Sequence, residues 1–140
     1  AARQGLGYTL RAVASASKLH PNSIRVQATD GTHTTELLGI SRGGGLIGIK
    51  EVEGYECNFT AQMHTLLFTA QDTKGSVGFL ASILAREEAN IATLTVARNA
   101  KDGTAKLVFE LDSGLRAPTL AYLRSLPWVE GVVYIPDIDL

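Results

Sequence analysis

The sequence predicts an α+β protein in which a strand-rich first unit precedes a unit of alternating strands and helices. Between residues 64 and 136 the apolar period changes from two, typical of strands, to about 3.6, typical of helices, and back again. Between residues 8 and 59, short alternating runs are separated by Gly, Pro and Asp turns. We therefore expect one unit over residues 1–62, mostly antiparallel β, and a second over residues 63–140.

The second unit is predicted to follow the order strand, helix, strand, strand, helix, strand. Its first strand is His64–Gln71, and the helix after it places Val77, Leu80, Ala81 and Leu84 on one face, with Asn90 expected in the left-handed turn that ends it. The other predicted elements are strands over Ile91–Ala97 and Ala105–Leu111 joined by a turn over Asn99–Gly103, a helix between Pro118 and Pro127, and a strand over Val129–Ile135.

This order makes two βαβ crossovers that share a hairpin, which is a split-βαβ, ferredoxin-like sandwich. Helices cover one face of such a sheet and leave the other open. Leu67 and Val108 make the open face apolar, so we expect it to pack on another element or another subunit.

The first unit reads as a meander of strands. The end of a helix over Ala1–Gly5 and a loop over Ala14–Lys18 flank its first strand. The predicted strands are Tyr8–Val13, Ile24–Ala28, Thr34–Ile40, Leu46–Val52 and Tyr55–Phe59. A bare antiparallel sheet of this size has little to cover its apolar face. We expect that the chain is the C-terminal piece of a longer protein, or that a partner covers this face.

Composition excludes several classes of function. The 140 residues carry a net charge of −1, whereas a nucleic-acid-binding domain usually has a basic face. No apolar run approaches the roughly 20 residues of a membrane helix, and no signal peptide is visible. The single cysteine, Cys57, excludes an internal disulfide framework and a multi-cysteine metal site, and suits a reducing, cytoplasmic compartment.

No catalytic or metal-binding set is recognisable in the sequence. His20, His33 and His64 do not lie three or four residues apart, so they lack metal-ligand spacing. Cys57 has no neighbouring His or Lys that would lower the pKa of its thiol. The residues alone therefore predict a non-catalytic binding module.

One turn is a candidate binding site. Asp72 to Val77 connects the first strand of the second unit to its first helix, where free backbone N–H groups favour a carboxylate. Gly75 allows a ligand to approach the backbone closely. A bound amino acid would place its carboxylate on the amides of Gly75, Ser76 and Val77, and its ammonium group on Asp72 or Asn90. The alternative is a plain turn whose helix is capped by Asp72 or Ser76.

The second unit resembles an ACT domain, the small regulatory unit that binds amino acids in enzymes of amino-acid metabolism. The resemblance depends on the Asp72-x-x-Gly75 turn and on the helix exit Glu88-Ala89-Asn90-Ile91. Lys74 stands where the family usually has proline.

The whole chain resembles the β chain of bacterial iron–sulfur-dependent L-serine dehydratase (L-serine ammonia-lyase). The motifs that carry this, in order, are His20-Pro21-Asn22-Ser23-Ile24, Gly39-Ile40-Ser41-x-Gly43-Gly44-Gly45-x-Ile47-x-Ile49 and Gly54-Tyr55, followed by the ACT-like unit. In this resemblance the first unit is a truncated domain, similar to the allosteric substrate-binding domain of some phosphoglycerate dehydrogenases.

The resemblance implies a role in converting L-serine to pyruvate and ammonia, a step that feeds gluconeogenesis. A [4Fe-4S] cluster would be ligated outside this chain, in a catalytic α chain. We expect contact with that chain at His20, Arg42, Gly43, Gly44 and Gly45, and homodimer formation through the ACT-like unit. The triple glycine has two alternatives, an anion cradle or a plain turn. The alternative family is an amino-acid-sensing domain of another enzyme, such as phosphoglycerate dehydrogenase.

Overall fold

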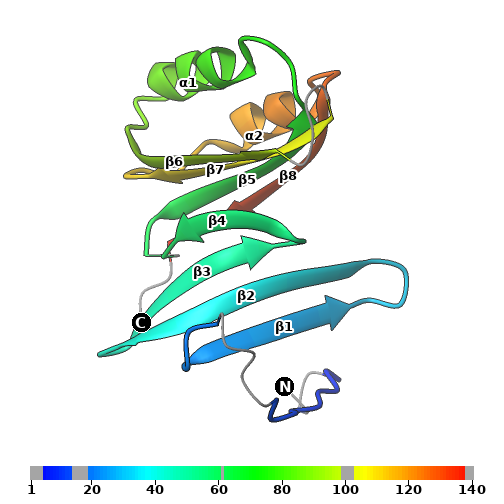
Figure 1. Ribbon diagram of the computed structural model, residues 1–140. Coiled ribbons are helices and arrows are strands. Elements are labelled where there is room, and N and C mark those ends of the chain that lie inside the picture. Colours follow the sequence, from blue (N-terminus) through cyan, green and yellow to red (C-terminus); the bar gives the residue numbers. More distant parts are fainter. Residues whose placement is uncertain (1–4, 14–18, 61, 99–102, 138–140) are drawn as a thin grey trace.

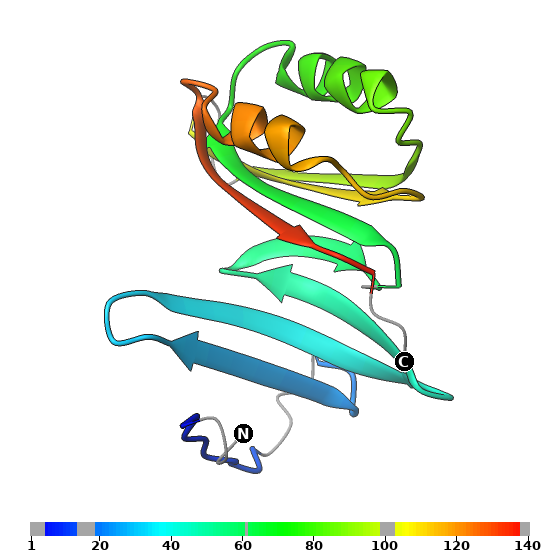
Figure 2. The ribbon, with the colours of Figure 1, turned by 180° about the vertical axis from the view of Figure 1, so that it is seen from behind.

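The computed structural model describes residues 5–13, 19–60, 62–98 and 103–137, and these form two four-stranded sheets. The first sheet is an antiparallel meander of β1 (Ser23–Thr29), β2 (Thr34–Gly43), β3 (Leu46–Val52) and β4 (Tyr55–Phe59). The second sheet is made of β5 (His64–Gln71), β6 (Ile91–Arg98), β7 (Thr104–Leu111) and β8 (Val129–Ile135). Two helices connect its strands, α1 (Ser76–Arg86) between β5 and β6 and α2 (Ala117–Arg124) between β7 and β8. Figure 1 shows both helices on the face of the second sheet that points away from the first, and Figure 2 shows the same stacking from behind.

The second sheet has the strand order β6-β7-β5-β8, with every neighbouring pair antiparallel. This is the split-βαβ arrangement predicted from the period changes, so the α+β fold class is confirmed. Its core lies between sheet and helices, where Leu80 and Leu84 of α1 pack with Phe68 and Phe109 of the sheet. The two phenyl rings pack edge to face, with their centroids 5.7 Å apart.

The helix boundaries follow local chemistry. Gly75 precedes α1 with φ 82°, a left-handed conformation that glycine adopts without steric cost. Proline lies in the first turn of α2, as expected for Pro118. At the end of α1 the prediction was wrong by two residues, because Glu88, with φ 58°, takes the left-handed conformation assigned to Asn90.

Three hairpins connect the strands of the first sheet. Asp30 Oδ1 accepts the amides of Thr32 and His33, each at 2.8 Å, in the β1–β2 turn. Gly44 and Gly45, with φ 62° and 83°, make the β2–β3 turn, in which both central residues need positive φ.

The predicted strand over Tyr8–Val13 is wrong, because residues 6–13 have no regular secondary structure. Tyr8, Leu10 and Val13 are exposed, and none is paired with a described strand. Alternation of apolar and polar residues does not by itself make a strand, because the backbone amides and carbonyls of a strand need hydrogen-bond partners on a neighbouring strand. The expected helix end over residues 1–4, the loop over 14–18 and most of the turn over 99–103 lie outside the described residues.

The two sheets pack against each other through a small second core. Cys57 and Phe59 of β4 lie with Val108 of β7, and the partly buried Leu67 packs against them. The expectation that the open face of the second sheet packs on another element is therefore confirmed, and the element is β4 of the same chain. The boundary between the two units, near residue 62, stays a prediction.

Two polar contacts extend this junction. Glu110 of β7 is 3% exposed, and its carboxylate accepts the amide and hydroxyl of Thr60 at 2.8 and 2.9 Å and the hydroxyl of Thr93 at 2.7 Å. Farther along β7, Lys106 forms an ion pair with Glu53 of the β3–β4 turn. The carboxylate therefore ties the segment that joins the two sheets directly to β6 and β7.

Candidate functional site

Four of the predicted ligand-binding residues line one hollow. Asp72, Gly75, Ser76 and Val77 surround a space of about 380 Å³ at the end of the second sheet. The other residues of the lining are Thr73, Lys74, Val96, Arg98, Ala105 and Leu107. The predicted turn therefore borders an open depression of the surface.

No side chain caps the N-terminus of α1. The cap expected from Asp72 or Ser76 is therefore wrong, whereas the plain strand-to-helix turn stays an alternative. The Ser76 amide donates to the Thr73 carbonyl oxygen at 3.2 Å, and Asp72 directs its carboxylate elsewhere. The first turn of α1 therefore has no side-chain acceptor for its amides.

The carboxylate of Asp72 faces Arg98, a residue that the sequence reasoning missed. Arg98 Nη1 lies 3.2 Å from Asp72 Oδ2, and both side chains line the hollow. A topological signal was present in the sequence. In a split-βαβ sheet β5 and β6 run in the same direction, so residues that follow or end them meet at one edge.

Asn90 lies away from this hollow. It precedes β6, whereas Arg98 ends it, so the rise of about 3.3 Å per strand residue places the two roughly 25 Å apart. The Asn90 amide instead donates to Asp112 Oδ1 at 2.9 Å. Within one chain, the structure does not bring Asn90 together with the other four predicted ligand-binding residues.

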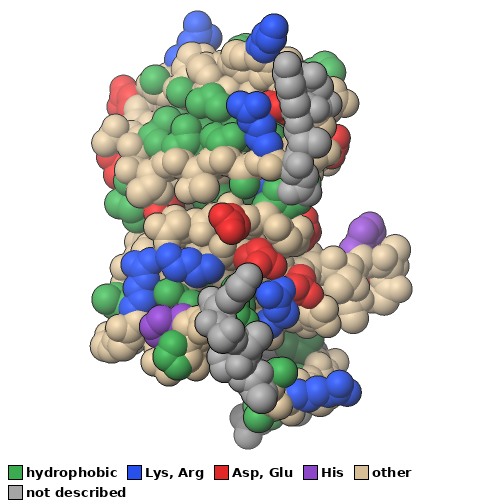
Figure 3. All heavy atoms as spheres, in the orientation of Figure 1, with side chains coloured by type: hydrophobic (Ala, Val, Ile, Leu, Met, Phe, Trp, Pro, Cys, Tyr) green, Lys and Arg blue, Asp and Glu red, His purple; other side chains and the backbone are tan. Residues whose placement is uncertain are grey.

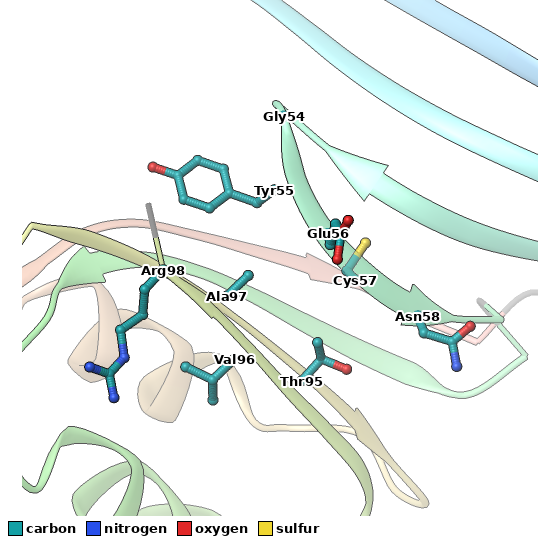
Figure 4. A pocket seen from close by; sticks show the side chains of 9 residues that line it. All are labelled: Gly54, Tyr55, Glu56, Cys57, Asn58, Thr95, Val96, Ala97 and Arg98. Carbon is teal, nitrogen blue, oxygen red and sulfur yellow. The ribbon is translucent and has the colours of Figure 1, made fainter. Parts of the chain in front are cut away.

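A second groove lies between β4 and β6, the edge strands of the two sheets. It has a volume of about 450 Å³, and its walls are Gly54–Asn58 and Thr95–Arg98. Figure 4 shows Thr95 and Ala97 on the side of β6 that faces β4, with Val96 and Arg98 on the opposite side. Because side chains alternate along a strand, β6 contributes to both hollows.

Cys57 lies on the wall of this groove but has an unreactive thiol. Burial is the main cause that raises the pKa of Cys57 to about 11, and the nearby Glu51 carboxylate adds to it. Thiolate, the nucleophilic and metal-binding form, is therefore scarce near neutral pH. The predicted role of Cys57 as a small structural residue agrees with its position in the second core.

The residues predicted to contact a catalytic subunit gather at one end of the first sheet. The Ser41 amide donates to the Asn22 carbonyl oxygen at 2.9 Å, which holds the turn after His20 beside the strand that carries Arg42. Gly43, Gly44 and Gly45 follow directly, and all are exposed. The structure thus places the five residues on one exposed end, where they are free of the junction between sheets.

Arg42 at this end is held in a defined position. Its guanidinium lies over Gly48. A Cβ atom added to Gly48 would lie only 2.9 Å from Arg42 Nε. Arg42 Nη2 and Lys50 Nζ both donate to Asn58 Oδ1, at 3.1 and 2.7 Å. Among the described residues, neither cation forms an ion pair with a carboxylate.

The described part of the chain offers no cluster of three or more His, Cys, Asp or Glu side chains that would hold a metal ion. Of the histidines, His64 bonds to the Tyr134 hydroxyl at 2.8 Å, and His33 is exposed in the β1–β2 turn. None of the helices within the described ranges is long and apolar enough to cross a membrane.

Comparison with known proteins agrees with the resemblance found in the sequence. The chain is 31% identical over 125 residues to the probable L-serine dehydratase β chain of Bacillus subtilis, covering 89% of this chain and 57% of that protein. The chain is therefore similar to L-serine dehydratase β chains over most of its own length. It is also 27% identical over 116 residues to the L-serine dehydratase β chain of Peptoniphilus asaccharolyticus, covering 82% of this chain and 52% of that protein.

The chain spans about half the length of these two β chains. A D-3-phosphoglycerate dehydrogenase of Bacillus subtilis is 32% identical over 92 residues, covering 66% of this chain and 17% of that enzyme. No protein-family model matches the chain. The similarity to the dehydratase β chains extends over more of this chain than the similarity to the dehydrogenase does.

Proposed function

We propose that this chain is the regulatory and assembly part of an L-serine dehydratase, an enzyme that converts L-serine to pyruvate and ammonia. The observation that carries the proposal is the similarity to two L-serine dehydratase β chains over 89% and 82% of the chain. Its cellular role would be the supply of pyruvate, for gluconeogenesis among other uses, in the cytoplasm.

The catalytic chemistry belongs in a partner α chain under this proposal. A [4Fe-4S] cluster needs three or four thiolate ligands, and the only cysteine of this chain has a buried thiol whose pKa is raised to about 11. The residues of this chain therefore do not fit such a cluster. When bound in the α chain, the cluster would supply a Lewis acid for the serine hydroxyl.

The second unit would act as an ACT domain that binds L-serine in the hollow at the start of α1. Three features support this role. The hollow has the volume of a small-molecule site, the adjoining helix end has no side-chain cap, and Asp72 supplies a carboxylate for an ammonium group. Binding there would report the serine concentration to the assembled enzyme.

Two surfaces are available for assembly. The exposed end that carries His20, Arg42 and the three glycines would contact the α chain, since all five residues are exposed there. The edge strand β6 would pair with a second copy of this chain, because the side chains of Leu94 and Val96 on it are 38% and 42% exposed. Figure 3 shows apolar side chains gathered on the helix-bearing half around this edge.

Two experiments test the proposal. Titration of the chain with L-serine by calorimetry should give stereospecific heat, with D-serine and glycine as controls, and Asp72→Ala should weaken it. No heat from any amino acid, in protein shown to be folded, would remove the sensing role.

Co-expression with a cluster-bearing α chain should give a stable complex that Arg42→Glu weakens. Arg124→Glu, on exposed α2, is the matched control. Failure of the two chains to co-purify would remove the assembly role.

The alternative is a regulatory domain of another enzyme of amino-acid metabolism. The 92-residue similarity to a phosphoglycerate dehydrogenase supports it. A dehydrogenase domain encoded upstream in the same reading frame would favour this alternative, and a separate gene for a cysteine-bearing partner would favour the dehydratase.

A further inference from the structure

The outer edge of β4 borders a groove instead of another strand. β4 is the last strand of the first sheet, so within the described residues the backbone groups on its outer side have no strand partner. The groove of about 450 Å³ separates β4 from β6, which is the last strand of the second sheet (Figure 4). Both sheets therefore end at the same groove, and a strand that entered it could extend the first sheet.

Glu56 on β4 carries a negative charge that the described residues do not balance. Its side chain is exposed, and within the described ranges no cation forms an ion pair with it. Glu51 of β3 is its cross-strand partner, so two carboxylates lie opposite each other on one face of the sheet. Like charges in such a pair destabilise a sheet. Arg25 lies 3.1 Å from Glu51, whereas a cation for Glu56 would have to come from elsewhere.

The opposite imbalance lies two residues farther along the same strand. Lys50 Nζ and Arg42 Nη2 both donate to Asn58 Oδ1, at 2.7 and 3.1 Å, so two positive charges share one neutral acceptor. In the part of the chain that the structure describes, no carboxylate pairs with either cation. Because side chains alternate along a strand, Glu56 and Asn58 lie on one face of β4, about 7 Å apart. The edge strand therefore carries an unbalanced carboxylate next to two unbalanced cations.

We propose that this edge binds a second copy of the chain, with the two β4 strands antiparallel about a two-fold axis through Cys57. This register places Glu56 of each copy opposite Asn58 of the other, and so beside the other copy's Lys50. Each copy supplies the charge that the other lacks, and the axis repeats the contact. The two neighbouring registers, centred on Glu56 or on Asn58, would instead place two carboxylates or two sets of cations opposite each other.

The second wall of the groove brings β6 into the same interface. Five residues of β4 make a short contact, and specific interfaces usually bury more surface than one short strand provides. On β6, the exposed side chains of Leu94 and Val96 add apolar area. This inference rests on the homodimer of the proposed function, and it adds the first sheet to an interface that was assigned to β6 alone.

Charge reversal tests the contact of Glu56 with Lys50, because Arg42 also belongs to the surface proposed for the α chain. Sedimentation equilibrium measures the dimer dissociation constant of the full chain, and circular dichroism establishes that each variant is folded. Glu56→Lys and Lys50→Glu should each raise this constant roughly tenfold or more, because each places like charges opposite each other at two points. The variant with both changes should recover most of the lost affinity. Glu130→Lys and Arg124→Glu make the same charge changes on exposed β8 and α2, and should leave the constant unchanged.

Cysteine substitution tests the register directly. Glu56→Cys and Asn58→Cys are made separately in a Cys57→Ala background, and are then oxidised alone and as an equal mixture. Opposite residues of an antiparallel pair have Cα atoms about 4.5–5.5 Å apart, within reach of a disulfide. The mixture should therefore form a disulfide-linked dimer. In either variant alone the two thiols lie on diagonal positions about 7–8 Å apart, so much less should form.

The outcomes separate this inference from the homodimer on which it rests. If the wild type dimerises but neither charge reversal weakens the dimer and the mixture forms no disulfide, the role of β4 is overturned and the pairing of β6 remains. Equal disulfide formation in one variant alone and in the mixture overturns the register through Cys57. If the folded wild type stays monomeric, the proposed homodimer fails, and this inference fails with it.

Discussion

Glu110 offers the sharpest test of how the two sheets are held together. The perturbation is Glu110→Ala, which removes a carboxylate that accepts three hydrogen bonds at 2.7–2.9 Å from Thr60 and Thr93. No cation pairs with Glu110 among the described residues, so its charge is balanced by neutral donors alone.

The size of the loss in stability depends on whether the three donors that bond to Glu110 find other acceptors. A hydrogen bond to a charged group contributes about 1.5–3 kcal/mol net, but burial of the carboxylate itself costs several kcal/mol. The two threonine hydroxyls can rotate to other acceptors, whereas the Thr60 N–H cannot, and an unsatisfied buried donor costs about 1–3 kcal/mol. We expect a loss of roughly 2–4 kcal/mol in the free energy of unfolding for Glu110→Ala. Glu110→Gln, which keeps one acceptor oxygen and gives Thr93 a donor, should lose about 1 kcal/mol.

Urea unfolding followed by circular dichroism measures both losses. Glu130→Ala is the matched control, because Glu130 is an exposed carboxylate on β8 and such surface changes stay within about 0.5 kcal/mol. Cleavage by a protease after residue 60 should also become faster in Glu110→Ala, since the segment would lose its anchor. A Glu110→Ala protein as stable as Glu130→Ala would refute the reasoning.

Three further predictions concern single residues. The side chains of Arg116 and Thr119 hold the pKa of Glu87 at about 2, well below its ordinary value, so its contribution to stability is full above about pH 4.5 and is lost as pH falls toward 2. Thermal unfolding should therefore show Glu87→Gln destabilised at pH 7, with a gap from wild type that closes by pH 2; a constant gap would contradict this. The Cys57 thiol, with its pKa raised to about 11 from 9.0, should react with a disulfide reagent at pH 8 about 100-fold more slowly than in unfolded protein, and equal rates would contradict its burial. Gly75→Ala should destabilise by about 1–2 kcal/mol because of its positive φ, while Gly78→Ala in open space within α1 should stabilise by about 0.5–1 kcal/mol, and like signs in urea unfolding would disprove this.

The local elements followed from the order of residues. Periods of two and about 3.6 mark β5 and α1, because an apolar face forms from residues close together in the chain. Gly31, Gly44 and Gly45 have positive φ in their turns, a conformation that glycine adopts because of its own lack of a side chain. The relation to L-serine dehydratase β chains was visible in short motifs kept in order.

Tertiary structure decided what those elements meet. The alternation of Tyr8–Val13 yields no strand, because pairing needs a partner that local sequence does not supply. The apolar Leu67 and Val108 are covered by β4, which is separated from β7 by more than forty residues of chain. Asn90 precedes β6 and Arg98 ends it, so the length of the strand leaves only Arg98 beside Asp72. The sequence determined the elements and the family likeness, and long-range strand pairing decided which charges share the hollow.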